Sequence, residues 1–465
     1  MDVNKALPPF EPWAWLRAWH ETWWAGAVPG IAASLRAQRL AALLAVARER
    51  SPLYRARLHD ARQLADVAPI DKRALMQQFD DWATDRRITR AAVQAFLARA
   101  DTLAAPFLDD YLLWTSSGTS GVPGWFVQDA KALAAYDATD ALRLRGAGPL
   151  QPALGAWGVG QRFAFVGASG GHFAGAVSLT RLARIVPPTL RPELALLSVL
   201  RPLNETAEAL ARFAPTVLIT YPSVAAALAR LQRGGALRLA LREVWLGGEQ
   251  LSPAQRQAAQ RSFGCTVRNC YGASECFSIA FECGAGALHV NEDWVVLEPV
   301  DQRLQPVPAG TLSHAVLLTN LANRVQPIIR YVLDDRVRLV PGACACGSGF
   351  ARIEVQGRSG DTLHLPGGRD CAVAIVPLAL ETAIEEQARV SQFQVIDRGG
   401  TRDRRLELRF EPAVGDARRA YARCRAAVQH YLAEQGVQRV RCVFSAEPPL
   451  RDARSGKLRR VRHAA

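Results

Sequence analysis

The chain has 465 residues, of which 49% are hydrophobic and 22% charged, so it can form a folded globular protein with a substantial core. The formal net charge is +14, but the arginines that create it are scattered and form no aromatic-interleaved basic stripe, so we expect no nucleic-acid partner. There is no apolar run of the roughly 18 residues that span a bilayer, no signal-peptide pattern and an odd number of cysteines, nine, so we expect a cytoplasmic protein without a transmembrane segment.

The first predicted elements are helices. Residues 10–24 contain five tryptophans and are expected to form a helix that packs on the body of the protein, with a dimer contact or a membrane-surface contact as the alternatives. The tryptophans are Trp13, Trp15, Trp19, Trp23 and Trp24. Residues 34–58 have the apolar spacing of a helix, which we expect to stop near the pair Ser51–Pro52.

From about residue 100 to residue 330, short strand-like runs alternate with helical runs. The strand-like runs include residues 162–167, 215–221, 241–248 and 315–320, and residues 222–233 are predicted to form an intervening helix. Such alternation predicts an α/β architecture.

The C-terminal part, about a hundred residues, follows a different pattern. Helices are predicted for residues 374–390 and 416–436, and strands for residues 392–398, 405–412 and 438–445. This order predicts a small α+β domain that begins near residues 357–361.

Residues 114–129, WTSSGTSGVPGWFVQD, contain a loop rich in Ser, Thr and Gly between two strand-like runs. Its glycines permit positive φ angles, and its backbone N–H groups can line an anion site. A Walker-type phosphate loop would add a lysine and lead into a helix, and this segment has neither feature. Taken alone, the segment is more often an ordinary turn.

Lysine is rare in this chain, since only four of the 57 basic residues are lysines: Lys5, Lys72, Lys131 and Lys457. A lysine in a chemically suggestive place is therefore informative. Lys131 falls in a predicted helix, and we interpret it as structural.

Five further segments follow the loop in chain order: LGGEQLS (246–252), NCYGASE (269–275), IIRYVLDDRVRL (328–339), EVQGRSGDTL (354–363) and RDARSGKLRRV (451–461). Together with the loop, this ordered set resembles the acyl-adenylate-forming superfamily, and most closely its phenylacetate–CoA ligase-like branch, over roughly residues 50–462. The resemblance implies an α/β fold with a large multi-subdomain N-terminal AMP-binding domain (residues 1–357) and a small mobile α+β C-terminal domain (residues 358–465).

The resemblance also implies a role for individual residues. The loop that closes over the β- and γ-phosphates of ATP would comprise Ser116, Ser117, Gly118, Thr119, Ser120 and Gly121. Gly248 and Glu249 would lie along the nucleotide, Tyr271 would stack on the adenine and Asn269 would read it. Gly272 would also bind the nucleotide, Ser274 would hydrogen-bond the α-phosphate and Asp335 would take the ribose hydroxyls. Glu275 would hold Mg²⁺, and Lys457 would reach the substrate carboxylate and the α-phosphate. Arg358 would begin a hinge whose pivot is residues 359–361.

Each assignment has a structural alternative. Tyr271 could be a core aromatic, Glu275 a carboxylate at a helix start, Asp335 a turn residue and Lys457 a solvated lysine near the C-terminus. The sequence also departs from the superfamily pattern, because no lysine follows Pro123 and the hinge has RSGD in place of a double aspartate.

A cluster of metal-binding residue types lies outside these motifs. Cys283, His289, Cys344 and Cys346 supply three thiols and one imidazole, which is a ligand set of structural zinc sites. The alternative is that they are ordinary free cysteines, as we expect for Cys265, Cys270, Cys276, Cys371, Cys424 and Cys442. His172, in the segment GASGGHF, is expected to be a hydrogen-bonded loop residue or part of an acyl-pocket or thiol-entry loop.

The function implied is an ATP-dependent carboxylate ligase that forms an acyl-adenylate and passes the acyl group to a thiol, most simply coenzyme A, with an aryl or arylacetic acid as substrate. ATP, Mg²⁺ and structural Zn²⁺ are the expected cofactors. One alternative is transfer to the phosphopantetheine of an acyl carrier protein or to another acceptor, and another is a non-catalytic nucleotide-binding scaffold. A homodimer is a further option.

Overall fold

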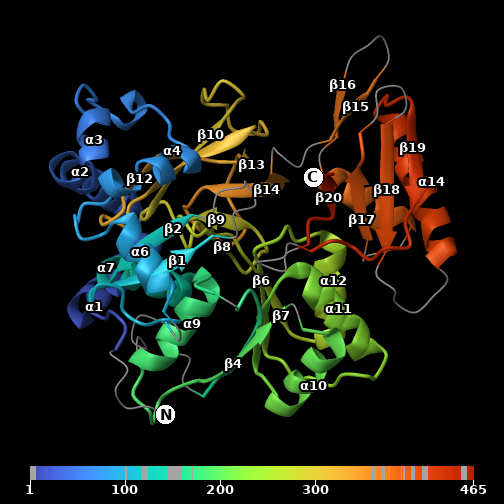
Figure 1. Cartoon of the computed structure of the whole chain (residues 1–465), viewed down its shortest axis with the longest axis horizontal. Coiled ribbons are helices and arrows are strands. Elements are labelled where there is room, and N and C mark those ends of the chain that lie inside the picture. Colours follow the sequence, from blue (N-terminus) through green and yellow to red (C-terminus); the bar gives the residue numbers. More distant parts are fainter. Residues whose placement is uncertain are drawn as a thin grey trace. The chain divides into compact units, whose positions relative to one another are not determined.

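The structure, a computed structural model, describes residues 7–99, 102–116, 124–144, 160–169, 171–199, 201–358, 363–367, 372–375, 377–388, 390, 393–399, 404–410, 417–451 and 458–464. The chain divides into two compact units (Figure 1). The first comprises Met1–Ser198, Arg268–Leu333 and Val337–Glu354, and the second Val199–Val267, Asp334–Arg336 and Val355–Ala465. Among the helices of the described ranges, none is long and apolar enough to cross a membrane.

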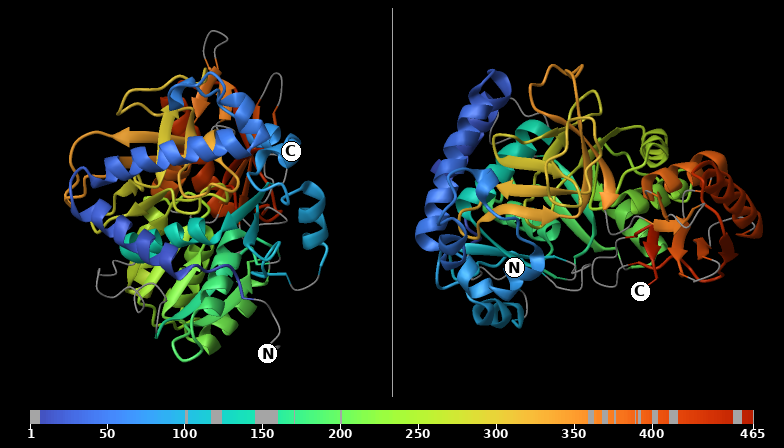
Figure 2. Two further views of the ribbon diagram at one scale, coloured as in Figure 1. Left: turned by 90° about the vertical axis from the view of Figure 1, so that its left-hand side faces the viewer. Right: turned by 90° about the horizontal axis from the view of Figure 1, so that it is seen from above.

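The first unit begins with the helices α1 (Pro12–Ala27) and α2 (Ile31–Arg50), which are blue in Figure 2. Trp15 and Trp19 stack with their ring centroids 5.4 Å apart, and Trp19 is fully buried. Both pack in one cluster with alanines of α7 (Ala130–Thr139). The predicted docking of a tryptophan-rich helix on the body of the protein is therefore confirmed.

Ser51 ends α2 and starts α3 (Pro52–Arg57), as the sequence predicts. Its Oγ accepts a hydrogen bond from the backbone N–H of Tyr54, and Pro52 fits the first helical position because it has no N–H to satisfy. The short helices that follow are η1 (Leu64–Asp66), α4 (Lys72–Gln77), α5 (Phe79–Trp82) and α6 (Arg90–Leu97).

The strands β1 (Tyr111–Thr115) and β2 (Trp125–Asp129) form an antiparallel hairpin in which Trp114 faces Phe126. This pairing confirms the two strands predicted on either side of the Ser/Thr/Gly-rich loop. After β2 the chain continues into α7 and the π-helix η2 (Asp140–Leu144).

Parallel strand pairs joined by a helix occur in both units, and they confirm the predicted α/β alternation. In the first unit β3 (Arg162–Gly167) pairs in parallel with β4 (Glu193–Ser198), and α9 (Ala174–Ile185) connects them. In the second unit β5 (Val217–Thr220) pairs in parallel with β6 (Glu243–Gly247), and α11 (Pro222–Arg233) connects them. The neighbouring elements are α10 (Leu203–Phe213), α12 (Pro253–Phe263) and β7 (Thr266–Cys270).

Antiparallel strands complete the first unit. β11 (Ala315–Asn320) is buried along its whole length between β10 (Val295–Val300) and β12 (Ile328–Leu333). A second group pairs β9 (Leu288–Val290) with β8 (Ala280–Glu282) and with β14 (Arg352–Arg358). The strand β13 (Asp335–Val340) follows β12 in the chain.

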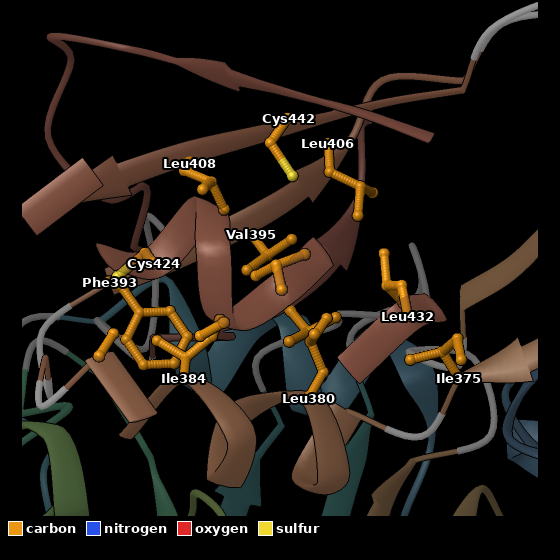
Figure 3. Close-up of a cluster of buried hydrophobic side chains, with 14 of the residues drawn as sticks. Ile375, Leu380, Ile384, Phe393, Val395, Leu406, Leu408, Cys424, Leu432 and Cys442 are labelled. Atoms are coloured by element: carbon orange, nitrogen blue, oxygen red, sulfur yellow. The ribbon is translucent and has the colours of Figure 1, made fainter. Parts of the chain in front are cut away.

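The C-terminal elements of the second unit have a core of their own (Figure 3). A four-stranded sheet has the order β19-β18-β17-β20. Its strands are β17 (Phe393–Asp397), β18 (Arg404–Phe410), β19 (Val440–Phe444) and β20 (Val461–His463). The helical elements are α13 (Pro377–Ala383), the π-helix η5 (Ile384–Ala388) and α14 (Ala417–Glu434). Side chains such as Phe393, Val395, Leu380 and Leu432 fill the space between them, where full burial of such a side chain contributes about 1.5–3 kcal/mol.

This arrangement confirms the predicted small α+β fold and corrects one boundary. The helix predicted for residues 374–390 starts only at Pro377, because Ala374 and Ile375 belong to β16 (Ala372–Ile375), which pairs with β15 (Leu363–Pro366). Proline has no N–H for a strand ladder but suits the first turn of a helix.

Candidate active site and metal centre

Glu275, the predicted Mg²⁺ ligand, is buried with 5% of its surface exposed. Its Oε1 accepts a hydrogen bond of 2.7 Å from the hydroxyl of Tyr331 in β12. Its backbone carbonyl accepts a second bond, of 2.9 Å, from the side-chain amide of Asn320 in β11. No helix begins at Glu275 in this described stretch, so it is not a helix-start carboxylate. Two core strands fix its position instead.

Lys72 is the functional candidate that the sequence analysis missed. Its ammonium nitrogen lies 4.0 Å from Oε1 of Glu275 and 3.4 Å from Oγ of Ser116, and only 18% of its side chain is exposed. At 4 Å two unit charges attract by about 4 kcal/mol in a partly screened protein environment. The available signal was the rarity of lysine in the chain, since Lys72 is one of only four.

The local fold explains why Lys72 reaches this place. Asp71 caps α4 by accepting a hydrogen bond of 2.8 Å from the backbone N–H of Ala74, so Lys72 is the first helical residue. Just before the cap, Ile70 forms a parallel bridge with Tyr331, the residue that also holds Glu275. The start of α4 is thereby fixed beside β12.

Ser116 stands where the predicted phosphate loop leaves β1. Its Oγ accepts a hydrogen bond of 2.8 Å from the backbone N–H of Gly124, and its own N–H donates to the Gly124 carbonyl at 2.9 Å. These two bonds close the base of the loop. The predicted loop residues Ser117, Gly118, Thr119, Ser120 and Gly121 lie outside the described residues.

The predicted adenine segment forms a compact turn. The Tyr271 carbonyl accepts 3.0 Å hydrogen bonds from the N–H groups of Ile279 and Ala280, and the Tyr271 ring is partly exposed, so it is not a buried core aromatic. A Cβ added at Gly272 would lie 1.9 Å from the carbonyl oxygen of Phe277, so this position requires glycine.

Two further predicted nucleotide-binding residues, Asn269 and Ser274, lie close to that turn in the sequence. The N–H of Asn269 donates to Glu282 at 3.2 Å, and Ser274 is partly buried one residue before Glu275. Both flank the turn within the first unit, where the structure brings together Ser116, Lys72 and Glu275.

Three predicted residues lie in the second unit. Gly248 follows β6 with a φ of 76°, a left-handed conformation that favours glycine. The carboxylate of Glu249 accepts hydrogen bonds of 3.0 Å from both the N–H and the Oγ of Ser223 at the start of α11. Asp335 is buried as the first residue of β13, not in a turn.

The remaining predicted residues concern the hinge and the C-terminal lysine. Arg358 is the last residue of β14. The pivot residues 359–361 and Lys457 lie outside the described residues, so their roles stay predictions.

The four predicted zinc ligands converge. The donor atoms of Cys283, His289, Cys344 and Cys346 all lie within 4.8 Å of one another. The Sγ atoms of Cys283 and Cys344 are 3.9 Å apart, close to the roughly 3.8 Å between sulfurs of a tetrahedral site with zinc–sulfur bonds of about 2.3 Å. The donor set therefore fits zinc.

The protonation of this cluster also suits a metal. Nδ1 of His289 lies 2.8 Å from the carbonyl oxygen of Phe350, which can only accept, so Nδ1 carries the proton and Nε2 presents its lone pair to Cys346 at 3.4 Å. A hydrogen bond from the backbone of Cys346 lowers the pKa of the Cys344 thiol to about 6, which favours the thiolate that binds metals.

Other cysteines in the described part of the chain are free thiols outside this cluster. Burial raises the pKa of Cys265 and Cys442 to about 11 and that of Cys424 to about 12. These values favour inert thiols, as expected. Cys371 lies outside the described residues.

His172 is a buried loop residue whose Nε2 lies 2.8 Å from the hydroxyl of Thr102. Burial lowers the pKa of this imidazole. The backbone carbonyl of His172 accepts a hydrogen bond of 2.7 Å from the N–H of Thr115, the last residue of β1. The expectation of a hydrogen-bonded loop histidine is confirmed.

Comparison with known proteins finds similar enzymes. The family model described as "AMP-binding enzyme" matches residues 183–310. The phenylacetate-coenzyme A ligase of Escherichia coli (strain K12) is 29% identical over 381 residues, which cover 79% of each chain. Among solved structures, 2-hydroxyisobutyryl-CoA ligase in complex with 2-HIB-AMP has a TM-score of 0.69 at 20% identity, over 95% of this chain and 91% of that one. A benzoate CoA ligase from Burkholderia xenovorans LB400 has a TM-score of 0.52 at 18% identity, over 75% and 67%.

The chain has an α/β fold like that of these solved ligases, and its residues 183–310 match the AMP-binding enzyme model. The match to the AMP-binding enzyme model and the similarity to phenylacetate-coenzyme A ligase over 79% of the chain support an acyl-adenylate-forming enzyme that is similar to phenylacetate-coenzyme A ligase.

Proposed function

We propose that this enzyme activates a carboxylic acid with ATP as an acyl-adenylate and then transfers the acyl group to the thiol of coenzyme A. The observation that carries the proposal is the placement of Lys72 between Ser116 at the base of the loop and the buried Glu275. The similarity to phenylacetate-coenzyme A ligase supports an aryl or arylacetic acid as the substrate class.

In the first half-reaction, a carboxylate oxygen of the acid attacks the α-phosphorus of ATP, and the bond from that phosphorus to the bridging oxygen breaks to release pyrophosphate. Negative charge grows on the phosphoryl oxygens, so fixed positive charge and hydrogen-bond donors at the loop lower the barrier. Lys72 provides the ammonium, and the Ser116 hydroxyl lies beside it.

The carboxylate of Glu275 fits a magnesium ligand. Tyr331 uses one acceptor position of Oε1, and a carboxylate has about four, so acceptor capacity is left for a hard cation. Mg²⁺ held there would neutralise charge on the triphosphate and on departing pyrophosphate.

In the second half-reaction, a thiolate attacks the acyl carbon of the mixed anhydride, and the bond to the AMP oxygen breaks to release AMP. We propose that the C-terminal domain turns near Arg358 between the two steps, so that Lys457 serves only the first.

Pyrophosphate exchange into ATP, measured across a panel of carboxylic acids, tests the first half-reaction. We expect exchange with aryl or arylacetic acids and, on adding coenzyme A, release of AMP with formation of a thioester. No exchange with any acid would instead favour a nucleotide-binding scaffold. Exchange followed by transfer only to a holo-carrier protein would identify the acceptor as an acyl carrier protein.

We also propose that Cys283, His289, Cys344 and Cys346 hold a structural zinc ion. The ion would join the β8–β9 hairpin to the segment before β14 and would take no part in the reaction. Metal analysis of protein purified without added zinc is expected to give about one zinc per chain. Cys283→Ser should lose the metal, whereas Cys265→Ser, outside the cluster, should keep it.

A cytoplasmic location and a homodimer complete the proposal. The free thiols are typical of a reducing compartment. The exposed rings of Trp13 (79%) and Trp24 (48%) on α1 favour self-association, and sedimentation at several protein concentrations tests it.

A further inference from the structure

Arg330 stands in β12 directly before Tyr331, the residue whose hydroxyl donates to the buried Glu275. Where the register of β11 and β12 shifts, two residues of β12 lie opposite one residue of β11, Thr319. Arg330 belongs to this β-bulge and has a φ of 46°. An extra residue in a strand changes the face of the sheet to which the following side chains point. The bulge therefore determines the direction of Tyr331, and with it the contact to Glu275.

The backbone conformation of Arg330 is a costly one for arginine. In the left-handed region the Cβ atom lies too close to a carbonyl oxygen, and glycine alone avoids this contact. Such strain persists only where the surrounding contacts hold the residue in place. Arg330 is held in this way, because it is 6% exposed and its N–H donates a hydrogen bond of 3.0 Å to Oγ1 of Thr319. An arginine at a position that suits glycine indicates that its side chain is needed there.

The guanidinium group of Arg330 binds the turn that precedes α4. Its Nη1 donates hydrogen bonds to the carbonyls of Ala65 at 2.8 Å and Val67 at 2.7 Å. Its Nε donates to Oε2 of Glu298 in β10 at 3.2 Å. These contacts fix the backbone around η1 to the three-stranded sheet of β10, β11 and β12.

The main chain of Arg330 holds the next part of the same segment. The Arg330 carbonyl accepts a hydrogen bond of 3.1 Å from the N–H of Ile70, and the Ile70 carbonyl accepts one of 2.9 Å from the N–H of Val332. Lys72 follows Ile70 by two residues and is the first residue of α4. One residue thus binds the segment that leads to Lys72 and also adjoins Tyr331, which holds Glu275.

The alternative is that Arg330 only stabilises the core as the ion-pair partner of Glu298. That pair needs no contact with the segment before α4, whereas two of the three side-chain hydrogen bonds of Arg330 go to carbonyls of that segment. The contacts on both sides of the Lys72–Glu275 pair favour a role in the site.

We propose that Arg330 is a positioning residue that sets the 4.0 Å separation between the ammonium of Lys72 and the carboxylate of Glu275. The residue acts through the segment before α4 on one side and through Tyr331 on the other, and it touches no substrate. The importance of this separation for the reaction rests on the function proposed above. The contacts themselves do not, so the two can be tested separately.

Acylation of lysine side chains in the folded full-length chain, without ligands, tests the contacts. Lys72 is 18% exposed, and Lys131 is an exposed lysine that serves as the internal reference. Arg330→Gly keeps the left-handed backbone and removes the guanidinium. It should raise the rate at which N-hydroxysuccinimidyl acetate acylates Lys72, relative to Lys131, by about fivefold or more, because the start of α4 is released. Peptide mass spectrometry measures both rates.

Glu298→Gln is the matched control, since it removes the charge of the pair but keeps an acceptor for Nε and both carbonyl contacts. It should leave the acylation of Lys72 as in the wild type. If Arg330→Gly folds poorly, the double variant with Glu298→Gln removes the unpaired carboxylate and tests the same contacts. An unchanged Lys72 rate in the folded variant, or an equal rise in Glu298→Gln, would overturn the proposal.

Pyrophosphate exchange gives the second readout. Arg330→Gly should lower the kcat of acid-dependent exchange by about tenfold, with the KM for the acid little changed, because a misplaced Lys72 loses its effect in the transition state. A variant that is less stable but keeps the wild-type kcat would show a purely structural role. Absence of exchange in the wild-type enzyme would count against the proposed function, while the acylation of Lys72 would still report on the contacts of Arg330.

Discussion

The ammonium of Lys72 lies 4.0 Å from the carboxylate of Glu275, and together they stand at the base of the Ser/Thr/Gly-rich loop. The loop has no lysine after Pro123, where the superfamily pattern would have one. The first residue of α4 provides a positive charge beside Ser116 instead. The charge at the loop base is therefore contributed by a helix that precedes the loop in the chain.

Lys72→Ala should reduce acid-dependent pyrophosphate exchange by about a hundredfold, because one preorganised charge at the phosphates is lost. Lys72→Arg should recover only part of the rate, since the planar guanidinium is bulkier than a point-like ammonium. Steady-state exchange kinetics provide the measurement. Lys131→Ala, an exposed lysine in α7, is the control and should behave as wild type. An unimpaired Lys72→Ala enzyme would rule out the assigned role.

Glu275→Gln keeps the shape of the side chain and its acceptor for Tyr331 but removes the charge. We expect a higher Mg²⁺ concentration for half-maximal rate and a loss of about a hundredfold in exchange rate. Tyr331→Phe should cost only about 1 kcal/mol of stability and leave the Mg²⁺ requirement similar. A magnesium titration of each variant separates the two effects. An unaltered Mg²⁺ requirement in Glu275→Gln would show that Glu275 does not hold the metal.

Lys457→Ala should severely lower the rate of acyl-adenylate formation and leave thioester formation from preformed acyl-AMP largely intact. The reason is that the lysine is proposed to serve only the charged transition state of the first step. Rapid-quench assays of the two half-reactions measure this separately. A similar loss of rate in both half-reactions would contradict the proposal that Lys457 serves only acyl-adenylate formation.

The carboxylate of Asp293 accepts hydrogen bonds from two buried arginines, Arg39 in α2 and Arg143 in η2. Arg143 also donates to the carbonyl of Thr22 in α1, so this network contacts both N-terminal helices. Oδ1 of Asp293 accepts from Arg143 at 2.7 Å and Oδ2 from Arg39 at 3.5 Å, and the Asp293 side chain is fully buried. Burial lowers the pKa of Arg39 even though the neighbouring carboxylates of Asp293 and Glu21 act to raise it. Asp293→Ala should destabilise the protein by about 3–5 kcal/mol, because two buried arginines lose a charged partner while Arg39 keeps Glu21 and Arg143 keeps Asn291.

Chemical denaturation followed by tryptophan fluorescence measures that loss. Asp60→Ala, which removes an exposed carboxylate paired with His59, is the control and should change stability by at most about 0.5 kcal/mol. A similar small change in Asp293→Ala would show that the buried network contributes little.

The apolar periodicity and the order of the motifs in the sequence were sufficient to predict the α/β architecture. The helix predicted for residues 222–233 matches α11, and the strand at residues 162–167 matches β3, because apolar spacing is a local property of the chain. The ordered motifs likewise pointed to the acyl-adenylate-forming class. The start of α13 was misplaced because a strand and a helix meet at Pro377, where an apolar run fits either.

Only the tertiary structure decided which side chains meet. Lys72 and Glu275 are far apart in the sequence, and they come together because Ile70 pairs with Tyr331 beside the buried acid. The partners of Glu249, Ser223 and Leu458, are likewise distant from it along the chain. Residue types and local periods are set by the sequence, but side-chain neighbours depend on how the strands and helices pack, which no local pattern specifies.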